Sequence, residues 1–200
     1  MATAIIQARL GSTRFPRKVE QMLPNGKRII DTIIDVALDS AAENVVVVTP
    51  DTELASTITQ CPAYIWGGKR DVLGEFWFAA RDFEDDIIRL TADCPLLSPE
   101  IIDGVLSEYI WQEVDYMCNT HDDSPVCDGY DVEVFSFKSL KLANLKATKE
   151  YDREHVTPYI RRNFKTGFCE MPEMEGCSVD TYDDYIEVCK IMENKHGSNT

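Results

Sequence analysis

The sequence predicts an α/β protein whose architecture is a three-layer α/β/α sandwich with a mostly parallel sheet. Its 200 residues are enough for one domain with a full core, and a hydrophobic content of 44% is typical of a globular chain. Short apolar runs alternate with segments of helical periodicity, which is the pattern of parallel strands joined by helices. In such sheets ligands bind beyond the carboxyl ends of the strands, so the loops there are the first candidates for a site.

The first half of the chain shows this alternation most clearly. Residues 2–8 are an apolar run that predicts a buried strand, and residues 28–40 carry apolar side chains at helical spacing. The four consecutive valines within residues 44–49 are typical of a parallel strand covered on both faces. The elements expected next are a helix at 52–59, a strand at 63–66, a helix at 72–83 and a strand at 86–90.

In the second half, Ser98-Pro99-Glu100 predicts a helix start, with an N-cap serine, proline at the first position and an acid after it. That helix is expected to end near Trp111. Strands are expected at 116–118, 132–137 and 168–171, and helices from Ser136 or Lys138 to Leu145, at 154–162 and at 182–192. Residues 1–195 are expected to form a single domain and residues 196–200 a frayed tail. The irregular residues 120–129 are expected at the rim of a site.

Positive charge is concentrated at the start of an otherwise acidic chain. The net charge is −15, yet residues 1–30 hold six basic residues and one acid, against 14 and 34 in the other 170 residues. This distribution indicates a compact polyanion such as a nucleoside triphosphate. Binding to a nucleic acid or to an anionic membrane is not expected, because most of the surface would repel either one.

Nothing in the sequence indicates secretion or a membrane span. The run Ala4-Ile5-Ile6 is followed at once by polar Gln7 and Arg9, unlike a signal peptide, and no apolar stretch approaches roughly 20 residues. The seven cysteines are odd in number and form no C-x-x-C pair, so neither a disulfide framework nor a zinc site is favoured. The sequence therefore predicts a cytoplasmic protein with reduced thiols.

The first strand ends in a loop that has the features of a phosphate-binding site. Residues 7–18 read Gln-Ala-Arg-Leu-Gly-Ser-Thr-Arg-Phe-Pro-Arg-Lys and include four cations. A small-residue loop between a strand and a helix turns backbone N–H groups toward an anion. A solvated basic turn is the alternative, and the strand-to-helix context favours anion binding.

Two aspartates have the positions expected of metal ligands. Asp93 follows the strand at 86–90, and Asp180 precedes the last helix. Mg²⁺ prefers one or two carboxylates together with water and phosphate oxygens. The alternatives are a turn cap for Asp93 and a helix cap for Asp180. Cys94 is interpreted as a packing residue, because the neighbouring carboxylate disfavours its thiolate.

Two further segments carry polar residues that could contact a substrate. Residues 128–134, Asp-Gly-Tyr-Asp-Val-Glu-Val, place three carboxylates around the start of a strand. Residues 152–158, Asp-Arg-Glu-His-Val-Thr-Pro, place polar residues at a helix start. Each segment could equally serve capping and solubility, and a lone histidine such as His155 is more often structural than catalytic.

Together these segments resemble the cytidylyltransferase family that includes the spore coat polysaccharide biosynthesis protein F group. That group is related to the enzymes that make CMP-activated ketodeoxyoctonate and nonulosonic acids. The resemblance runs from Ile5 to about Met192 and is stronger for the family than for the substrate. The matching segments, in order, are residues 5–18, 71–73, 89–96, 131–136, 153–158 and 179–181.

The resemblance implies a glycosyltransferase-A-like fold of the nucleotide-diphospho-sugar transferase type. It also implies transfer of CMP from CTP to a sugar acid, with Mg²⁺ as cofactor and pyrophosphate as the leaving group, for surface polysaccharide or glycan synthesis. Cations and Mg²⁺ would stabilise the charge that develops on pyrophosphate.

The same resemblance assigns roles to individual residues. The catalytic residues it implies are Arg14, Lys18 and Asp93, and the metal ligands are Asp93 and Asp180. The nucleotide-binding residues it implies are Arg9, Leu10, Gly11, Ser12, Arg14, Lys18, Asp71 and Arg89. Asp131, Glu133 and His155 would face the sugar.

The sequence departs from the family pattern at several positions. Arg17 and Ala92 stand where the family usually has glycine, and Gly68 stands where it usually has serine. Ala92 requires that the backbone there not need a positive φ. Loss of the serine hydroxyl would weaken a contact to the base or ribose, and the turns between the second and fourth strands are short. Arg17 is the first place at which altered specificity is expected.

Two other functions are compatible with the sequence. One is a sugar-1-phosphate nucleotidyltransferase or a nucleotide-sugar glycosyltransferase on the same fold. It would need a second cationic patch, for which Arg161, Arg162 and Lys165 are the candidates. The other is a non-catalytic nucleotide-binding module. Family members are often dimers, so the resemblance implies a homodimer, although the aromatic residues within 72–83 are interpreted as core.

Overall fold

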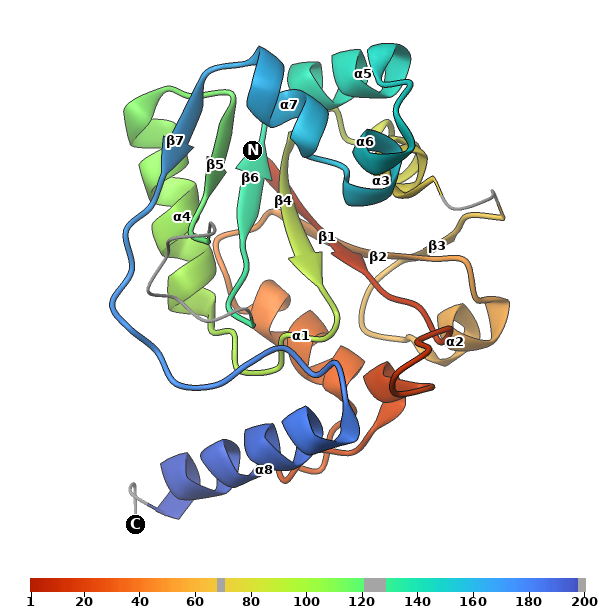
Figure 1. Cartoon of the computed structure of the whole chain (residues 1–200), viewed down its shortest axis with the longest axis vertical. Coiled ribbons are helices and arrows are strands. Elements are labelled where there is room, and N and C mark those ends of the chain that lie inside the picture. Colours follow the sequence, from red (N-terminus) through yellow and green to blue (C-terminus); the bar gives the residue numbers. More distant parts are fainter. Residues whose placement is uncertain (68–70, 121–128, 198–200) are drawn as a thin grey trace.

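The computed structural model describes residues 1–67, 71–120 and 129–197, and within them one seven-stranded sheet lies between two layers of helices (Figure 1). The strand order is β3-β2-β1-β4-β6-β5-β7. The strands are β1 (Ala2–Gln7), β2 (Asn44–Thr49), β3 (Ala63–Ile65), β4 (Asp86–Thr91), β5 (Tyr116–Cys118), β6 (Glu133–Phe135) and β7 (Thr166–Phe168). Only β6 runs antiparallel to its neighbours in this described sheet, which confirms the mostly parallel sandwich.

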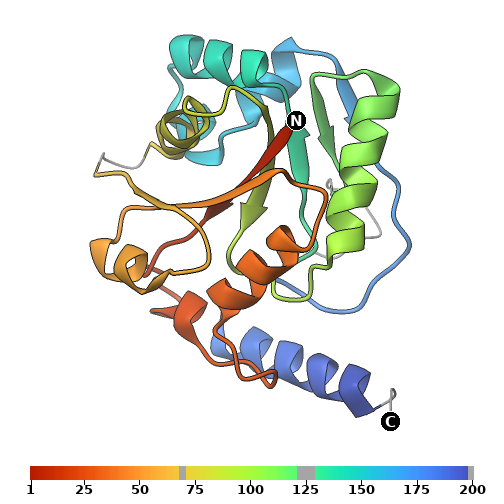
Figure 2. The ribbon, with the colours of Figure 1, turned by 180° about the vertical axis from the view of Figure 1, so that it is seen from behind.

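Helices cover both faces of the sheet, as the views from the front and from behind show (Figures 1 and 2). On one face lie α1 (Ile29–Leu38), α2 (Thr52–Thr57) and α4 (Pro99–Gln112). On the other face lie α3 (Val72–Ala80), α5 (Phe137–Lys146) and α7 (Pro158–Asn163), with α6 (Glu150–His155) packed beside α3.

The alternation of side chains along the strands divides the core into two layers. Ile6 of β1 faces the layer of α1 and α4, together with Val47 of β2. Ile5 and Val46 face α3 and α5 on the other side. These residues are fully buried, because both faces of a parallel sheet are covered by helices.

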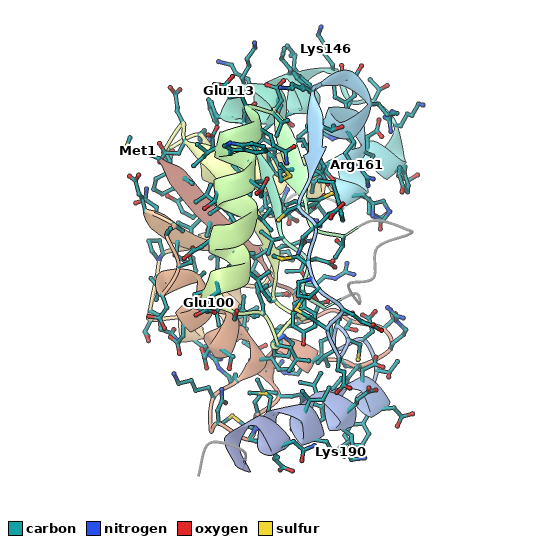
Figure 3. All side chains as sticks on the ribbon, turned by 90° about the vertical axis from the view of Figure 1, so that its left-hand side faces the viewer. Met1, Glu100, Glu113, Lys146, Arg161 and Lys190 are labelled. Carbon is teal, nitrogen blue, oxygen red and sulfur yellow. The ribbon has the colours of Figure 1, made fainter. Side chains whose placement is uncertain are left out.

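The last helix, α8 (Tyr182–Gly197), lies apart from both layers at the lower end of the molecule in Figure 1. Figure 3 shows it, marked by Lys190, below α4, which runs from near Glu100 to near Glu113. Val188 of α8 packs in a third cluster with Leu23 and Leu96. The helix continues through residues 196 and 197, where the sequence predicted a frayed tail, and residues 198–200 lie outside the described residues.

Two local predictions were wrong, and one short helix was missed. The single helix expected at 154–162 is two helices, α6 and α7, separated by Val156 with φ 67°. Thr157, which precedes Pro158, is itself in the αR region, so the break lies at Val156. The strand expected at 168–171 is β7, which begins at Thr166 where it pairs with Tyr116. The 3₁₀ helix η1 (Lys18–Glu20) was not predicted, and the expected rim segment lies mostly within 121–128, outside the described residues.

Two general expectations concern thiols and membranes. Among the described cysteines, those at positions 61, 118, 169 and 189 are free thiols. No described helix combines the length and the apolar character that a membrane span requires.

Candidate active site

A pocket of about 610 Å³ opens beyond the carboxyl ends of β1, β2 and β4. It is lined by residues from the loop after β1, from the start of α3, from the end of β4, from the C-terminal end of α6 and from the segment before α8. The predicted site residues that line it are Arg9, Gly11, Ser12, Arg14, Lys18, Arg89, Asp93, His155 and Asp180. A second cavity of about 510 Å³, mainly between Leu96, Ile101, Met174 and Ile191, contains none of the predicted site residues.

The loop after β1 is held in shape by its own backbone and by the loop after β2. The backbone N–H of Leu10 donates a hydrogen bond of 2.7 Å to the carboxylate of Asp51. The carbonyl of Leu10 accepts from the N–H groups of Ser12 and Arg17, at 2.9 and 3.1 Å. Leu10 therefore anchors the loop and packs against the core, whereas Arg9 and Arg14 extend from it as exposed cations.

Lys18 joins the two predicted metal ligands. Its Nζ donates to Asp93 Oδ2 at 2.7 Å and to Asp180 Oδ1 at 2.9 Å, and its side chain is 10% exposed. Burial by itself lowers the pKa of Lys18, but the two carboxylates outweigh it and raise the pKa above the usual value. Arg14 adds a second cation, 2.7 Å from Asp180 Oδ2.

The same carboxylates fit a divalent cation. Burial opposes the charge on Asp180, yet Lys18 and Arg14 hold the pKa of Asp180 below its ordinary value, so it is ionised at neutral pH. Two carboxylates that share one ammonium are the donor set Mg²⁺ takes when phosphate oxygens and water complete its coordination. The described residues form no cluster of three or more His, Cys, Asp or Glu that would enclose a metal by themselves.

Arg89 and Glu133 form a buried ion pair between β4 and β6. The two residues are direct partners in the antiparallel register, and Arg89 Nη1 donates to Glu133 Oε2. Tyr116 and Thr157 donate to Glu133 Oε1 at 2.5 and 2.7 Å. Burial alone would raise the pKa of Glu133, but Arg89 and the hydroxyl donors hold it below the ordinary value.

The two residues of this ion pair, both predicted site residues, lie in different places relative to the pocket. Arg89 lines the pocket, and its Nε is buried without a hydrogen-bond partner among the described residues. The Glu133 side chain is instead engaged in the interior. The pocket lining likewise includes no atom of Asp131 within the described chain, so contacts of Asp131 and Glu133 with a sugar remain predictions.

Asp71 joins α3 to α6. Its carboxylate caps α3 by accepting from the Gly74 N–H at 3.0 Å, and it accepts from Arg153 Nε at 2.7 Å. A Cβ at position 74 would lie 2.5 Å from Asp71 Oδ2, so this cap requires glycine there. Asp71 thus supports the wall of the pocket from behind, and its predicted contact with a nucleotide remains a prediction.

The turn between α6 and α7 carries backbone strain. Val156, a β-branched residue, has φ 67° and ψ −60°, an outlier that L side chains rarely adopt. On one side of it His155 lines the pocket, and on the other Thr157 bonds Glu133. The polar side chains of His155 and Thr157, on either side of the strained residue, therefore have different surroundings.

The backbone at Arg17 explains why the family usually has glycine at this position. Arg17 has φ 57° and ψ 28°, the left-handed conformation that favours glycine. Its guanidinium pairs with Glu20 at 2.6 Å and Glu53 at 2.8 Å and does not line the pocket. Ala92 has no positive φ, as its side chain requires. Gly68 lies outside the described residues.

The candidate second cationic patch has partners within the fold. Arg162 Nη2 lies 2.6 Å from each carboxylate oxygen of Asp152. Lys165 Nζ donates to the carbonyls of Gln112 and Glu113. These cations do not line the pocket in the described structure.

The sequence analysis did not identify Glu75. This residue is 6% exposed in the first turn of α3, yet it lines the pocket. Burial and the nearby Asp71 raise the pKa of Glu75 to about 7. No motif indicated this residue, because its burial depends on how α3 lies over the sheet.

A cationic loop facing two carboxylates, at the carboxyl edge of a mostly parallel sheet, defines the class of nucleotidyltransferases. Within that class the chain belongs to the cytidylyltransferase family, whose model matches residues 3–189. The spore coat polysaccharide biosynthesis protein SpsF of Bacillus subtilis is 31% identical, over 96% of this chain and 86% of SpsF. A 3-deoxy-manno-octulosonate cytidylyltransferase of Chlorobium phaeovibrioides is 34% identical, over 54% of this chain and 45% of its own length.

Solved structures show the same fold. A cytidylyltransferase from Leptospira borgpetersenii has a TM-score of 0.79 and 25% identity, covering 98% of this chain and 95% of its own. The CMP:2-keto-3-deoxy-manno-octonic acid synthetase complexed with CTP has a TM-score of 0.75 and 18% identity, over 97% and 99% of the two chains. These likenesses confirm the nucleotide-diphospho-sugar transferase fold implied by the sequence resemblance, and the family makes the protein a nucleotidyltransferase.

Proposed function

We propose that this protein transfers CMP from CTP to a sugar acid and releases pyrophosphate, with Mg²⁺ as its cofactor. The observation that carries the proposal is the Lys18–Asp93–Asp180 cluster beside the cationic loop. One pocket thereby offers cations for a triphosphate and carboxylates for the metal that accompanies it.

The residues of the loop would bind the phosphates. Arg9, Ser12 and Arg14 line the pocket around the anchored backbone, and Lys18 lies at its base. Asp93 and Asp180 would hold Mg²⁺, which when bound supplies charge that stabilises the transferring phosphoryl group. Lys18 neutralises these carboxylates here and would be available to the phosphates once a divalent cation bound them.

The reaction requires positioning more than covalent chemistry. A sugar hydroxyl attacks the α-phosphorus, an O–P bond forms, and the bond to the β-phosphate oxygen breaks with its electrons going to pyrophosphate. The hydroxyl proton passes to solvent water as the new bond forms. Arg14 and Lys18 line the pocket and would stabilise the charge on the leaving group, and holding both reactants in one pocket would lower the entropic cost.

Arg89 supports a carboxylate-bearing acceptor. It lines the pocket from β4, while the phosphate loop follows β1, and Glu133 holds its guanidinium in place. An arginine fixed in this way suits a planar carboxylate. The Chlorobium relative is named for 3-deoxy-manno-octulosonate, which is such an acid.

The test is pyrophosphate release with CTP, Mg²⁺ and a panel of keto-sugar acids that begins with 3-deoxy-manno-octulosonate. We expect release with at least one acid, and a loss of about 100-fold or more in kcat for Asp93→Asn. Glu187→Gln, an exposed charge change on α8, is the matched control. Release that Asp93→Asn leaves unchanged would refute the metal assignment, and turnover of sugar 1-phosphates alone would refute the sugar-acid assignment.

The cellular role in this proposal is supply of a CMP-sugar for surface polysaccharide synthesis by a cytoplasmic homodimer. The name of the SpsF relative supports the polysaccharide role. Light scattering on the purified chain tests the homodimer, with a mass near twice 22.7 kDa as the expected result.

A further inference from the structure

Glu75 is a buried residue whose side chain lines the pocket. Its side chain comes from the first turn of α3, and the residue is 6% exposed. No described residue donates a hydrogen bond to its carboxyl group, although the pocket reaches it. A carboxyl group that lines a pocket and has no described protein donor is free to accept a hydrogen bond from a donor on a bound ligand.

The order of the strands places Glu75 at one end of the pocket. Pro50, which follows β2, and Val72, which begins α3, line the pocket with it. Asp93 lines the pocket from the end of β4, on the other side of β1 and its phosphate loop. A nucleotide whose phosphates meet the loop and the two aspartates therefore has the region of Glu75 left for its nucleoside.

We propose that Glu75 reads the base of the nucleotide by accepting a hydrogen bond from the exocyclic amino group of cytosine. Uracil carries a carbonyl oxygen at the same position, and two acceptors facing each other in a buried site repel. Glu75 thereby selects CTP over UTP, by attraction to one base and repulsion of the other. This inference rests on the proposed function, because it takes the pocket to bind a pyrimidine triphosphate.

The charges around Glu75 are consistent with this role. Asp71 of the same helix and Asp51 after β2 disfavour its ionisation, and Arg9 after β1 favours it. The nearby carboxylates repel a further hydrogen-bond acceptor at this end of the pocket and attract an amino group. Arg9 keeps the carboxylate form accessible near neutral pH.

Equilibrium binding of CTP and UTP to the full chain, with Mg²⁺ and no acceptor, tests the proposal by titration calorimetry. Glu75→Gln keeps the size of the side chain, but its amide can donate to the uracil carbonyl as well as accept from cytosine. We expect the wild type to bind CTP more tightly than UTP. In the variant the ratio of CTP to UTP affinity should be about tenfold smaller. Glu187→Gln on the exposed side of α8 should keep the wild-type ratio.

A ligand-side measurement covers the case in which the variant folds poorly. A CTP analogue with hydrogen in place of the amino group should bind the wild type about tenfold more weakly than CTP. Equal binding of CTP and the analogue, equal binding of CTP and UTP by the wild type, or an unchanged ratio in folded Glu75→Gln would each overturn the inference. Because no acceptor is present, failure of sugar transfer refutes the proposed function without affecting this result.

Discussion

Lys18 Nζ lies 2.7 Å from Asp93 Oδ2 and 2.9 Å from Asp180 Oδ1, although 75 and 162 positions separate these residues in the chain. The backbone supports the same arrangement, because the Val179 N–H donates to the Asp93 carbonyl at 2.8 Å. The cluster thus joins the N-terminal loop, the end of β4 and the segment before α8 at one point. It gives the protein a cation between two carboxylates before any nucleotide binds.

Replacement of Lys18 by methionine leaves Asp93 and Asp180 close together without their shared cation. We expect the free energy of unfolding to fall by about 1–3 kcal/mol, because two partly buried carboxylates lose their partner. Added Mg²⁺ should restore more stability to this variant than to the wild type. Thermal unfolding with and without Mg²⁺ measures both effects, with exposed Lys146→Met as the control. An equal response to Mg²⁺ in both proteins would contradict the metal assignment.

Replacement of Glu133 by glutamine removes the charge that balances buried Arg89. We expect a loss of about 3–5 kcal/mol in urea unfolding at pH 7, because an uncompensated guanidinium remains inside. Thr157→Val removes only one hydroxyl donor and should cost about 1 kcal/mol. A loss for Glu133→Gln no greater than that for Thr157→Val would show that the ion pair does not stabilise the fold.

The pH dependence of the Glu133 variant has a definite sign. The pKa of Glu133 is lower in the folded protein than in the unfolded chain, where it is about 4.3. Its contribution is therefore present above about pH 4.3 and is lost as the pH falls through the folded-state pKa. The stability difference between wild type and Glu133→Gln should shrink below about pH 4, measured by urea unfolding at pH 7, 5 and 3. A difference that stays constant over this range would contradict the lowered pKa.

Replacement of Arg17 by glycine should change little, despite the expectation that this position alters specificity. Glycine relieves the left-handed backbone strain, while the exposed pairs with Glu20 and Glu53 are lost, so the two effects oppose each other. We expect a melting temperature within about 4 °C of the wild type. The Kd for CTP should be nearly unchanged, since Arg17 does not line the pocket. A large change in the ratio of CTP to UTP binding would restore Arg17 as a specificity residue.

The preference for CTP over UTP should depend on pH through Glu75. The pKa of Glu75 is raised to about 7, so the carboxylate dominates at pH 8 and the protonated acid at pH 6. The acid can donate to the uracil carbonyl, so the ratio of CTP to UTP affinity should fall as the pH falls from 8 to 6. Glu75→Gln should show no such slope in the same calorimetric titrations. Parallel profiles for the two proteins would assign the titration to another group.

Local sequence patterns were sufficient for most elements and for the position of the cationic loop. The four valines 45–48 and Pro99 at the first helical position mark their strand and helix through residues that are adjacent in the sequence. Where a neighbour decided the outcome, local patterns failed. β7 begins at Thr166 because it pairs with β5, and α6 ends at strained Val156 although the periodicity runs on.

The same distinction applies to the site. The sequence by itself determined the sheet architecture, the cationic loop and the positions of Asp93 and Asp180, because ligands of such sheets gather where strands end. Only the tertiary structure decided which charges meet: Lys18 lies between the two aspartates, Glu133 balances Arg89 from inside, and Asp71 is paired with Arg153. It also buried Glu75 beside the pocket. These contacts join segments far apart in the chain. Their geometry therefore depends on how the helices pack on the sheet and cannot be deduced from the spacing of residues in the sequence.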